Sequence, residues 1–545
     1  MGRGMQPGEK PKDLKKSVKK LMQYIAKYKI AIFVVMLFAA FSTIFNVAGP
    51  KILGKATTAL SEGLMKKIQG TGSIDFHKIG LILLIVLALY LASALFSFVQ
   101  GWIMTGITQK VCYRLRREIS EKINRMPMKY FESRTYGEVL SRITNDVDTL
   151  GQGLNQSITT IITSVATLIG VLVMMLSISP LMTLIALIIL PISMGLIALV
   201  TRKSQKYFHA QQEYLGHING QVEEVYGGHL VVKAFNHEKE TIDEFERTNR
   251  ILYNSAWKSQ FLSGMMQPIM MFVGNLGYVA VAISGSMLAI KGTIEVGDIQ
   301  AFIQYVRSFT QPITQVAQVS NMLQSMAAAT ERVFEFLEEE EEDQFAENPV
   351  HDENLQGSVT FEHVKFGYDE DKIIIHDFNS QISPGQTVAI VGPTGAGKTT
   401  MVKLLMRFYD VNEGAIKVDG YDIRDFNRSE LRENFGMVLQ DTWLFKGTIM
   451  ENIRYGRLDA TDEEVIAAAK AAHAHHFIET LPGGYQMELN EDASNVSQGQ
   501  KQLLTIARAI LADNPILILD EATSSVDTRT EIQIQNAMDN LMKGR

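Results

Sequence analysis

Six long apolar runs constrain this chain more than any other feature of its sequence. They lie at residues 30–52, 79–104, 158–178, 181–200, 265–290 and 296–319. A helix needs about 20 mainly apolar residues to cross the hydrocarbon core of a bilayer. The mean hydropathy of the whole chain is only +0.04, because an ordinary soluble composition follows residue 320. The sequence therefore predicts a membrane α-helical bundle of six transmembrane helices, fused to a soluble α/β half.

The connections between the runs predict which side of the membrane each part faces. Only a few residues around Ser179 and Pro180 separate the third and fourth runs, which indicates a tight hairpin. The connections 105–157 and 201–264 are much longer, basic and helical in pattern, so we expect extended helices below the membrane. The positive-inside rule places both connections and the N-terminus in the cytoplasm. Six spans then return the second half of the chain to the cytoplasm.

The N-terminal segment 1–29 predicts a basic amphipathic entry helix. Apolar residues recur at helical spacing from Leu14 to Ile25 with lysines around them, a pattern suited to the lipid surface of an anionic leaflet. A solvated charged helix is the alternative, which the membrane span directly after it disfavours. The single cysteine, Cys112, leaves no intramolecular disulfide to form. No basic patch interleaved with aromatic residues indicates a nucleic-acid partner.

The sixth run is the least apolar and carries several glutamines and Arg307. Polar groups at membrane depth are costly unless they face a cavity or a partner. We interpret this helix as lining a substrate cavity, with Arg307 as the candidate substrate-binding residue. Hydrogen bonding between helices, or a position close to the interface, is the alternative. Four methionines between Met265 and Met271 are suited to an adaptable cavity wall or to plain helix packing.

We assign residues 30–325 to the transmembrane domain, 326–356 to a linker and 357–545 to the soluble domain. The linker begins as a helical continuation and contains an acidic run, residues 338–343, which we expect to be a solvated hinge surface. Short strands are predicted at 359–361 and 364–366.

A glycine-rich loop carries the first chemical signal of the soluble domain. It fits the phosphate-binding pattern G-x-x-x-x-G-K-[ST], between an apolar run at 387–391, expected to be a strand, and a helical run at 401–408. Glycine permits the tight turn that aims backbone N–H groups at phosphate oxygens, and the helix N-terminus adds partial positive charge. The candidate ATP-binding residues here are Gly392, Pro393, Thr394, Gly395, Ala396, Gly397, Lys398, Thr399 and Thr400.

Further residues predict ATP with Mg²⁺ as the bound pair. Lys398 would reach the β- and γ-phosphates, and the Thr399 hydroxyl would bind Mg²⁺. An apolar run at 516–519 ends in Asp520, suited to hold Mg²⁺, and Glu521, suited to orient the attacking water as the catalytic residue. Tyr368 follows a strand ahead of the loop and is suited to stack on adenine, with a core position as the alternative.

These motifs resemble the ATP-binding cassette (ABC) transporter family, in its exporter half-transporter form with a membrane domain ahead of a nucleotide-binding domain. The resemblance covers nearly the whole chain. It implies that Gln440 of the Q-loop contacts Mg²⁺ and ATP, that Asp527 belongs to the D-loop, and that Glu491 is the X-loop acid. It also identifies the signature, which contacts a partner's ATP, as Ser497, Gln498, Gly499 and Gln500.

The resemblance implies a mechanism as well. Two nucleotide-binding domains close head to tail, so that ATP lies between the P-loop of one chain and the signature of the other. Coupling regions at 126–131 and 220–233 would transmit closing and opening to the membrane domain, which alternates between inward- and outward-facing states. The implied partners are a second half-transporter, membrane lipid and a hydrophobic small-molecule substrate.

The signature departs from the family pattern, because Gln498 stands where the first glycine is usual. Glu521 is intact. This combination resembles the catalytic-glutamate subunit of heterodimeric bacterial multidrug exporters, so we predict a heterodimer in which this chain supplies the hydrolytic P-loop site. Harmless variation in a homodimer is the alternative. None of the eleven histidines stands at the family's switch-histidine position, and we expect the sequence to be part of a longer chain. The alternative is a product that lacks this contact to the γ-phosphate and the final strands.

The predicted function is ATP-driven export of hydrophobic or amphipathic compounds, of multidrug type, across the bacterial cytoplasmic membrane. Lipid or peptide export by the same architecture is the close alternative. An ATP-gated channel or regulator is a different class, against which the intact Glu521 argues. A soluble ATPase of the DNA-repair type is excluded by the six spans, and the fusion of the two domains favours export over import.

Overall fold

The computed structural model divides the chain into two compact units. The first comprises Met1–Ser120 with Leu140–Glu338, and the second Glu121–Val139 with Glu339–Arg545. The middle of the first long connection, residues 121–139, therefore folds as part of the second unit. The structure describes residues 13–351, 355–369, 372–393, 395–439, 442–491, 493–520 and 528–545.

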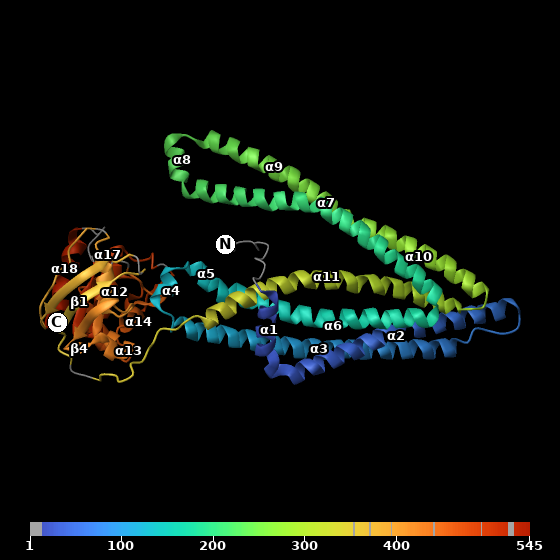
Figure 1. Ribbon diagram of the computed structural model, residues 1–545, viewed down its shortest axis with the longest axis horizontal. Helices are drawn as coiled ribbons and strands as arrows, with labels where there is room; N and C mark the ends of the chain where they lie inside the picture. Colours follow the sequence, from blue (N-terminus) through green and yellow to red (C-terminus); the bar gives the residue numbers. More distant parts are fainter. Residues whose placement is uncertain are drawn as a thin grey trace. The chain divides into compact units, whose positions relative to one another are not determined.

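Long helices make up the first unit (Figure 1). Six helices of 25 to 48 residues contain the predicted spans, except that the fifth span begins one residue before α10. Most of these helices are longer than the roughly 20 residues that cross a bilayer core, as expected. Shorter turns at Ala26–Tyr28 and Arg142–Asp146 connect some of them. The helices are α1 (Leu14–Ile25), α2 (Lys29–Ile68), α3 (Phe76–Ile123), α6 (Val147–Ile178), α7 (Pro180–Gly227), α8 (His229–Phe235), α9 (Glu238–Gly264), α10 (Met266–Ile290) and α11 (Val296–Glu338).

The predicted hairpin between the third and fourth spans is present. The Ser179 hydroxyl accepts a hydrogen bond from the Met182 N–H at 3.4 Å, which caps the start of α7. Pro180 occupies the first turn of α7, where a missing N–H costs no helical hydrogen bond.

Five helical segments in the described part of the chain are long and apolar enough to cross a membrane by length and composition, and they contain α2, α3, α6, α7 and α10. The sixth span, α11, is not among them because it is more polar. It is nevertheless central to the unit: α11 packs against α2, α6 and α10, and its Phe302 and Tyr305 are fully buried.

The second unit is an α/β fold. A four-stranded sheet has the order β2-β1-β3-β4, β5 pairs with β8 in parallel, and β6 pairs with β7. The strands are β1 (Val359–Phe366), β2 (Ile375–Ile382), β3 (Glu413–Val418), β4 (Tyr421–Asp422), β5 (Phe435–Val438), β6 (Gly447–Thr448), β7 (Glu488–Leu489) and β8 (Ile516–Leu519). The helices are α4 (Met128–Glu132), α12 (Lys398–Leu405), α13 (Arg428–Arg432), α14 (Ile449–Arg454), α15 (Asp462–Ala471), α16 (His475–Thr480), α17 (Gln498–Ala512) and α18 (Thr528–Met542), with α5 (Tyr136–Ser141) at the boundary of the two units and single turns at Ile423–Asp425 and Gly484–Gln486.

Two strand predictions need correction. The segments 359–361 and 364–366 form one strand, β1, interrupted by a shift in register where His363 adopts a φ of 48°. The apolar run at 387–391 is not a strand, and Val391 is 86% exposed. Apolar composition predicts burial, but a strand also needs a neighbour that supplies backbone hydrogen bonds. No described strand pairs with this run.

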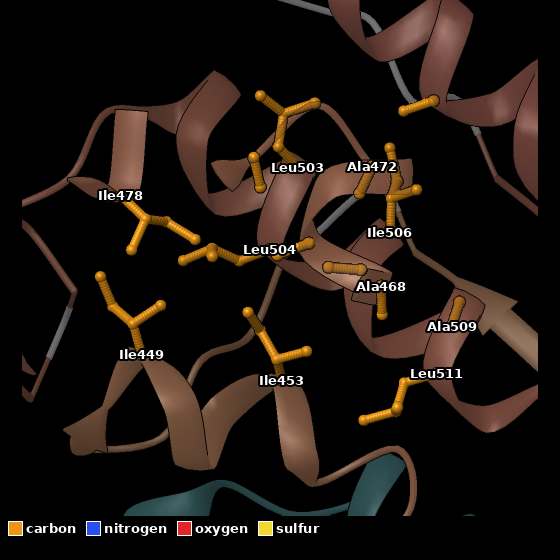
Figure 2. Close-up of a cluster of buried hydrophobic side chains, with 14 of the residues drawn as sticks. Ile449, Ile453, Ala468, Ala472, Ile478, Leu503, Leu504, Ile506, Ala509 and Leu511 are labelled. Carbon is orange, nitrogen blue, oxygen red and sulfur yellow. The ribbon is translucent and has the colours of Figure 1, made fainter. Parts of the chain in front are cut away.

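Two hydrophobic clusters hold the elements that carry the candidate site. In one, Leu503 and Leu504 of α17 meet Ile449 and Ile453 of α14 (Figure 2), which fixes the direction of α17 and so the place of the signature at its start. The other cluster contains Met401 and Leu404 of α12 together with residues of β5 and β8. The P-loop helix and the parallel strand pair therefore share one hydrophobic core.

Candidate nucleotide-binding site

The P-loop has the backbone geometry that its glycines predict. Gly395 and Gly397 have φ angles of 84° and 91°, in the left-handed region that glycine adopts without strain. A Cβ on Gly397 would also lie 3.1 Å from Ile374 Cγ2. No side chain caps the start of α12 at Gly397. The first N–H groups of α12 are therefore suited to phosphate oxygens.

The side chains of the loop are arranged around the same point. Lys398 Nζ donates hydrogen bonds to the carbonyl oxygens of Gly392, at 2.7 Å, and Pro393, at 3.3 Å. The Lys398 ammonium group thus lies over the loop, where it could form an ion pair with a bound phosphate. Thr399 is exposed and Thr400 is buried. Thr394 lies outside the described residues.

Asp520, one of the predicted Mg²⁺ ligands, follows β8, which pairs in parallel with β5. Val438 of β5 pairs with Leu519 of β8, and the Asp520 N–H donates to the Val438 carbonyl at 2.9 Å. Asp520 therefore directly follows a strand that shares one hydrophobic cluster with the P-loop helix α12. Carboxylate and hydroxyl oxygens, as on Asp520 and Thr399, are ligands of the type that Mg²⁺ prefers. Gln440, Glu521 and Asp527 lie outside the described residues.

Tyr368 lies at the end of a small aromatic group. Its hydroxyl is 3.2 Å from the Thr400 hydroxyl on α12. Its ring makes edge contacts with Phe366, at a centroid distance of 5.1 Å, and Tyr409, at 5.0 Å. The side chain is half-buried, so part of the ring is accessible to a nucleobase.

The sequence did not predict that Glu132 contacts residues that pack around the Tyr368 ring. Glu132, at the end of α4, accepts hydrogen bonds from Lys403 Nζ and from the Tyr409 hydroxyl, each at 2.8 Å. The coupling region predicted at 126–131 stops one residue short of it. Burial, then the hydrogen bond and the charge of Glu132, raise the pKa of Tyr409. Burial alone would lower the pKa of Lys403, but hydrogen bonding to Glu132 and the charge effects of Tyr368 and Glu132 outweigh it and raise that pKa.

The acidic run is exposed over most of its length, as its composition predicts, but Glu342 is an exception. Glu342 is only 10% exposed and pairs with Arg432 at 2.8 Å and Arg428 at 3.2 Å. Its N–H donates to the Arg125 carbonyl at 2.8 Å, and Glu341 pairs with the Arg125 guanidinium at 2.6 Å. A run of carboxylates looks solvated in a sequence because its cationic partners lie about 90 and 200 residues away in the chain.

The signature residues start α17 with a reciprocal cap. The Ser497 hydroxyl accepts from the Gln500 N–H at 3.3 Å, and the Gln500 side chain accepts from the Ser497 N–H at 2.8 Å. Gly499 is buried within the first turn. The amide of Gln498 donates to the Thr442 hydroxyl at 3.2 Å. Gln498, the unusual residue of the signature, is therefore hydrogen-bonded to Thr442, two residues after Gln440 in the sequence. Glu491 is exposed.

The second coupling region, predicted at 220–233, corresponds to the end of α7 and to α8. No residue of α8 is buried, and its Leu230 and Phe235 are 83% and 69% exposed. Asn236 ends the helix in the left-handed conformation, with a φ of 57°. The predicted coupling role of this region therefore stays a prediction, and its exposed apolar side chains are accessible to a protein partner.

In the membrane unit, the polar residues of α11 divide into two groups. Gln300 and Gln315 accept hydrogen bonds from Thr57 and Ser164, on α2 and α6, so for these two the alternative role of joining helices is the observed one. Gln304, Arg307 and Gln311 are exposed. Their spacing of three and four residues places them on one face of the helix.

Family models match both units. The model described as the ABC transporter transmembrane region matches residues 32–313, and the model described as ABC transporter matches residues 375–524.

Curated relatives extend over nearly the whole chain. A fatty acid ABC transporter ATP-binding/permease protein of Mycobacterium tuberculosis is 44% identical over 99% of this chain and 90% of its own length. An ATP-dependent lipid A-core flippase of Syntrophus aciditrophicus is 34% identical over 85% of this chain and 77% of its own length. A putative multidrug export ATP-binding/permease protein of Bacillus subtilis is 33% identical over 97% of this chain and 90% of its own length.

Proposed function

The chain belongs to the ABC transporter family as an ATP-hydrolysing, exporter-type half-transporter, and from this premise we propose that it exports amphipathic compounds with an anionic head group. It would do so across the bacterial cytoplasmic membrane by alternating access, as one half of a dimer. The observation that carries the substrate class is the exposed polar face of α11.

This face cannot lie against lipid at low cost. A guanidinium at membrane depth is costly unless it meets water or a partner charge, and Gln304 and Gln311 extend the polar strip on either side of Arg307. The strip therefore suits the wall of a water-accessible cavity. A guanidinium presents a fork of N–H donors that fits carboxylates and phosphates. Fatty acids carry a carboxylate and lipid A carries phosphates. One relative is named a fatty acid transporter and another a lipid A-core flippase.

Export of uncharged drugs is the second candidate. The relative from Bacillus subtilis is named a putative multidrug export protein. The methionines at the start of α10 favour this candidate, because flexible thioethers adapt to varied apolar ligands. The two candidates differ in whether Arg307 is needed for the substrate to bind.

ATP would supply the driving force through the cleavage of its terminal phosphate. The chain's own residues would divide the work: α12 N–H groups and Lys398 bind the phosphates, and Thr399 with Asp520 and Gln440 hold Mg²⁺. Glu521 follows Asp520 in the chain and would orient the attacking water. Positioned charge of this kind is the main contribution that proteins make to phosphoryl transfer.

We also propose that the partner is a different polypeptide. Glu521 is retained while the signature carries Gln498 in place of glycine, and Gln498 is bonded to Thr442. This chain would then provide the hydrolytic P-loop site, including Tyr368 and Asp520, and would lend its own signature to a second site that binds ATP but turns it over slowly.

Glu521→Gln tests the catalytic assignment. The variant should bind ATP with nearly unchanged affinity and lose about 100-fold or more of its turnover in the assembled transporter, because the lost group acts on the transition state. Undiminished turnover would remove Glu521 from the catalytic role.

Substrate stimulation of ATP hydrolysis in reconstituted vesicles tests the head-group assignment. Long-chain fatty acids should stimulate wild type, Arg307→Ala should raise the concentration needed for half-stimulation about tenfold or more, and Arg307→Lys should restore part of it. Equal responses of the three proteins to every anionic compound, with retained responses to uncharged drugs, would favour the multidrug candidate.

A further inference from the structure

We propose that Glu132 is a positioning residue for the adenine of ATP, through which the first coupling helix sets the nucleotide affinity of its own chain. The inference rests on the proposed role of Tyr368 in stacking on adenine. It assigns a role in base binding to a residue that the sequence analysis placed in the transmembrane domain, directly after the predicted coupling region.

The carboxylate of Glu132 contacts two different supports of the Tyr368 ring. One oxygen accepts from Lys403 Nζ and the other from the Tyr409 hydroxyl, each at 2.8 Å. Lys403 Nζ lies 5.5 Å from the centroid of the Tyr368 ring, in the range of a cation–π contact. The Tyr409 ring meets the Tyr368 ring edge to face, at an interplanar angle of 83°.

Tyr368 is thus fixed on several sides, and two of these contacts depend on Glu132. Its hydroxyl is within hydrogen-bonding distance of Thr400 and Phe366 packs against its edge, both independently of α4. Loss of the Glu132 carboxylate would leave these in place but release the Lys403 and Tyr409 side chains. An aromatic ring stacks productively only when its plane is held before the base arrives, because each immobilised side chain costs entropy on binding.

The phosphate end of the site is built from other groups. The P-loop backbone and Lys398 bind there, and Lys398 is held by the carbonyl oxygens of Gly392 and Pro393, not by α4. A change at Glu132 should therefore affect recognition of the base more than recognition of the triphosphate. This separation distinguishes a positioning role from a general structural one.

The experiment measures displacement of a trinitrophenyl-ATP probe from the full chain, purified in nanodiscs, by ATP and by inorganic triphosphate, both with Mg²⁺. Tyr368→Ala should weaken ATP binding about 5- to 100-fold, the range for loss of one aromatic–base stack. Glu132→Gln should weaken it about three- to tenfold, as for residues that modulate a site they do not touch. Triphosphate binding should be unchanged in both variants, and Glu132→Asp should recover part of the ATP affinity.

Glu413→Gln is the matched control, because it removes the carboxylate of a Lys–Glu pair of similar length, 2.6 Å to Lys365, elsewhere in the same unit. It should change neither affinity. If Tyr368→Ala weakens ATP selectively and Glu132→Gln does not, the inference about Glu132 is wrong while the proposed site stands. If Glu132→Gln weakens ATP and triphosphate equally, its role is structural and the inference is again wrong. If Tyr368→Ala leaves ATP binding unchanged, the proposed adenine site itself fails.

Discussion

The two regions predicted to couple the domains, which contain α4 and α8, differ in their contacts. α4 belongs to the same compact unit as the nucleotide-binding fold, and its Glu132 binds Lys403 and Tyr409. α8 has no buried residue and exposes Leu230 and Phe235. Polar contacts hold α4 against the nucleotide-binding fold, whereas α8 presents exposed apolar side chains. The difference shows that α4 is attached within the unit of its own chain that carries the nucleotide-binding fold. We propose that the apolar end of α8 is covered by a partner chain.

The largest expected effect concerns how firmly the α4 connection is attached. The linker beside it is held by Glu342, whose side chain pairs with Arg428 and Arg432. Glu342→Ala would remove the carboxylate that pairs with Arg432, whereas the buried Arg428 keeps Asp410 at 2.8 Å. We therefore expect a loss of about 3 kcal/mol, the lower end of the range for breaking a buried pair. Chemical denaturation of the purified chain should show this loss. Glu340→Ala, an exposed change in the same acidic run, should be silent, and a similar small effect for both would mean that the linker is not a firm attachment.

The second prediction tests the apolar end of α8. Phe235→Asp should lower substrate-stimulated ATP turnover of the assembled transporter about 30-fold or more, the scale expected for a hot-spot residue in a protein interface. ATP affinity should remain, because α8 belongs to the other compact unit. Glu240→Gln, an exposed change shortly after α8, serves as the control. Unchanged substrate-stimulated ATP turnover in Phe235→Asp would show that α8 needs no apolar partner surface. It would contradict the proposed difference between α8 and α4.

The third prediction concerns the other region that awaits a partner, the signature. Gln498→Gly would remove the hydrogen bond to Thr442 and restore the small residue usual in the family. In a heterodimer with a slow second site, total turnover should rise about two- to fivefold, a change of about 1 kcal/mol or less in the barrier. An unchanged or lower turnover, measured beside the wild-type assembly, would speak for harmless variation at this position.

The smallest expected effect is the pH dependence of the Glu341–Arg125 pair. The hydrogen bond from Arg125, and then the charges of Arg125 and Lys122, lower the pKa of Glu341 against the opposing effect of burial. A carboxyl group with a lowered pKa stabilises the fold above its unfolded pKa, and this contribution is lost as the pH falls through its folded pKa. Because Glu341 is 38% exposed, Glu341→Gln should cost less than about 1 kcal/mol at pH 7. Denaturation curves of the two proteins should converge in acid, and a gap that persists there would contradict the ionic origin.

Much of this molecule could be predicted from its sequence, because its strongest signals are local. A run of about twenty apolar residues predicts a membrane span without reference to the rest of the chain. The glycines of the P-loop likewise predict positive φ angles at their own positions. The non-local features were missed. Glu132 gives no sign that it lies against Lys403 and Tyr409, some 270 residues later in the chain. The burial of Glu342 likewise depends on arginines about 90 residues away, and the run at 387–391 was expected to be a strand on composition alone.

The central claim is that the ATP site of this chain is completed by a second, different polypeptide. Its most direct test is the rate of ATP hydrolysis of the lone chain in lipid vesicles, compared with the same chain co-purified with a candidate partner half-transporter. The account predicts little hydrolysis from the lone chain and a rise of about 100-fold or more in the assembly, abolished by Glu521→Gln in this chain alone. Full hydrolysis and transport by the lone chain would contradict it.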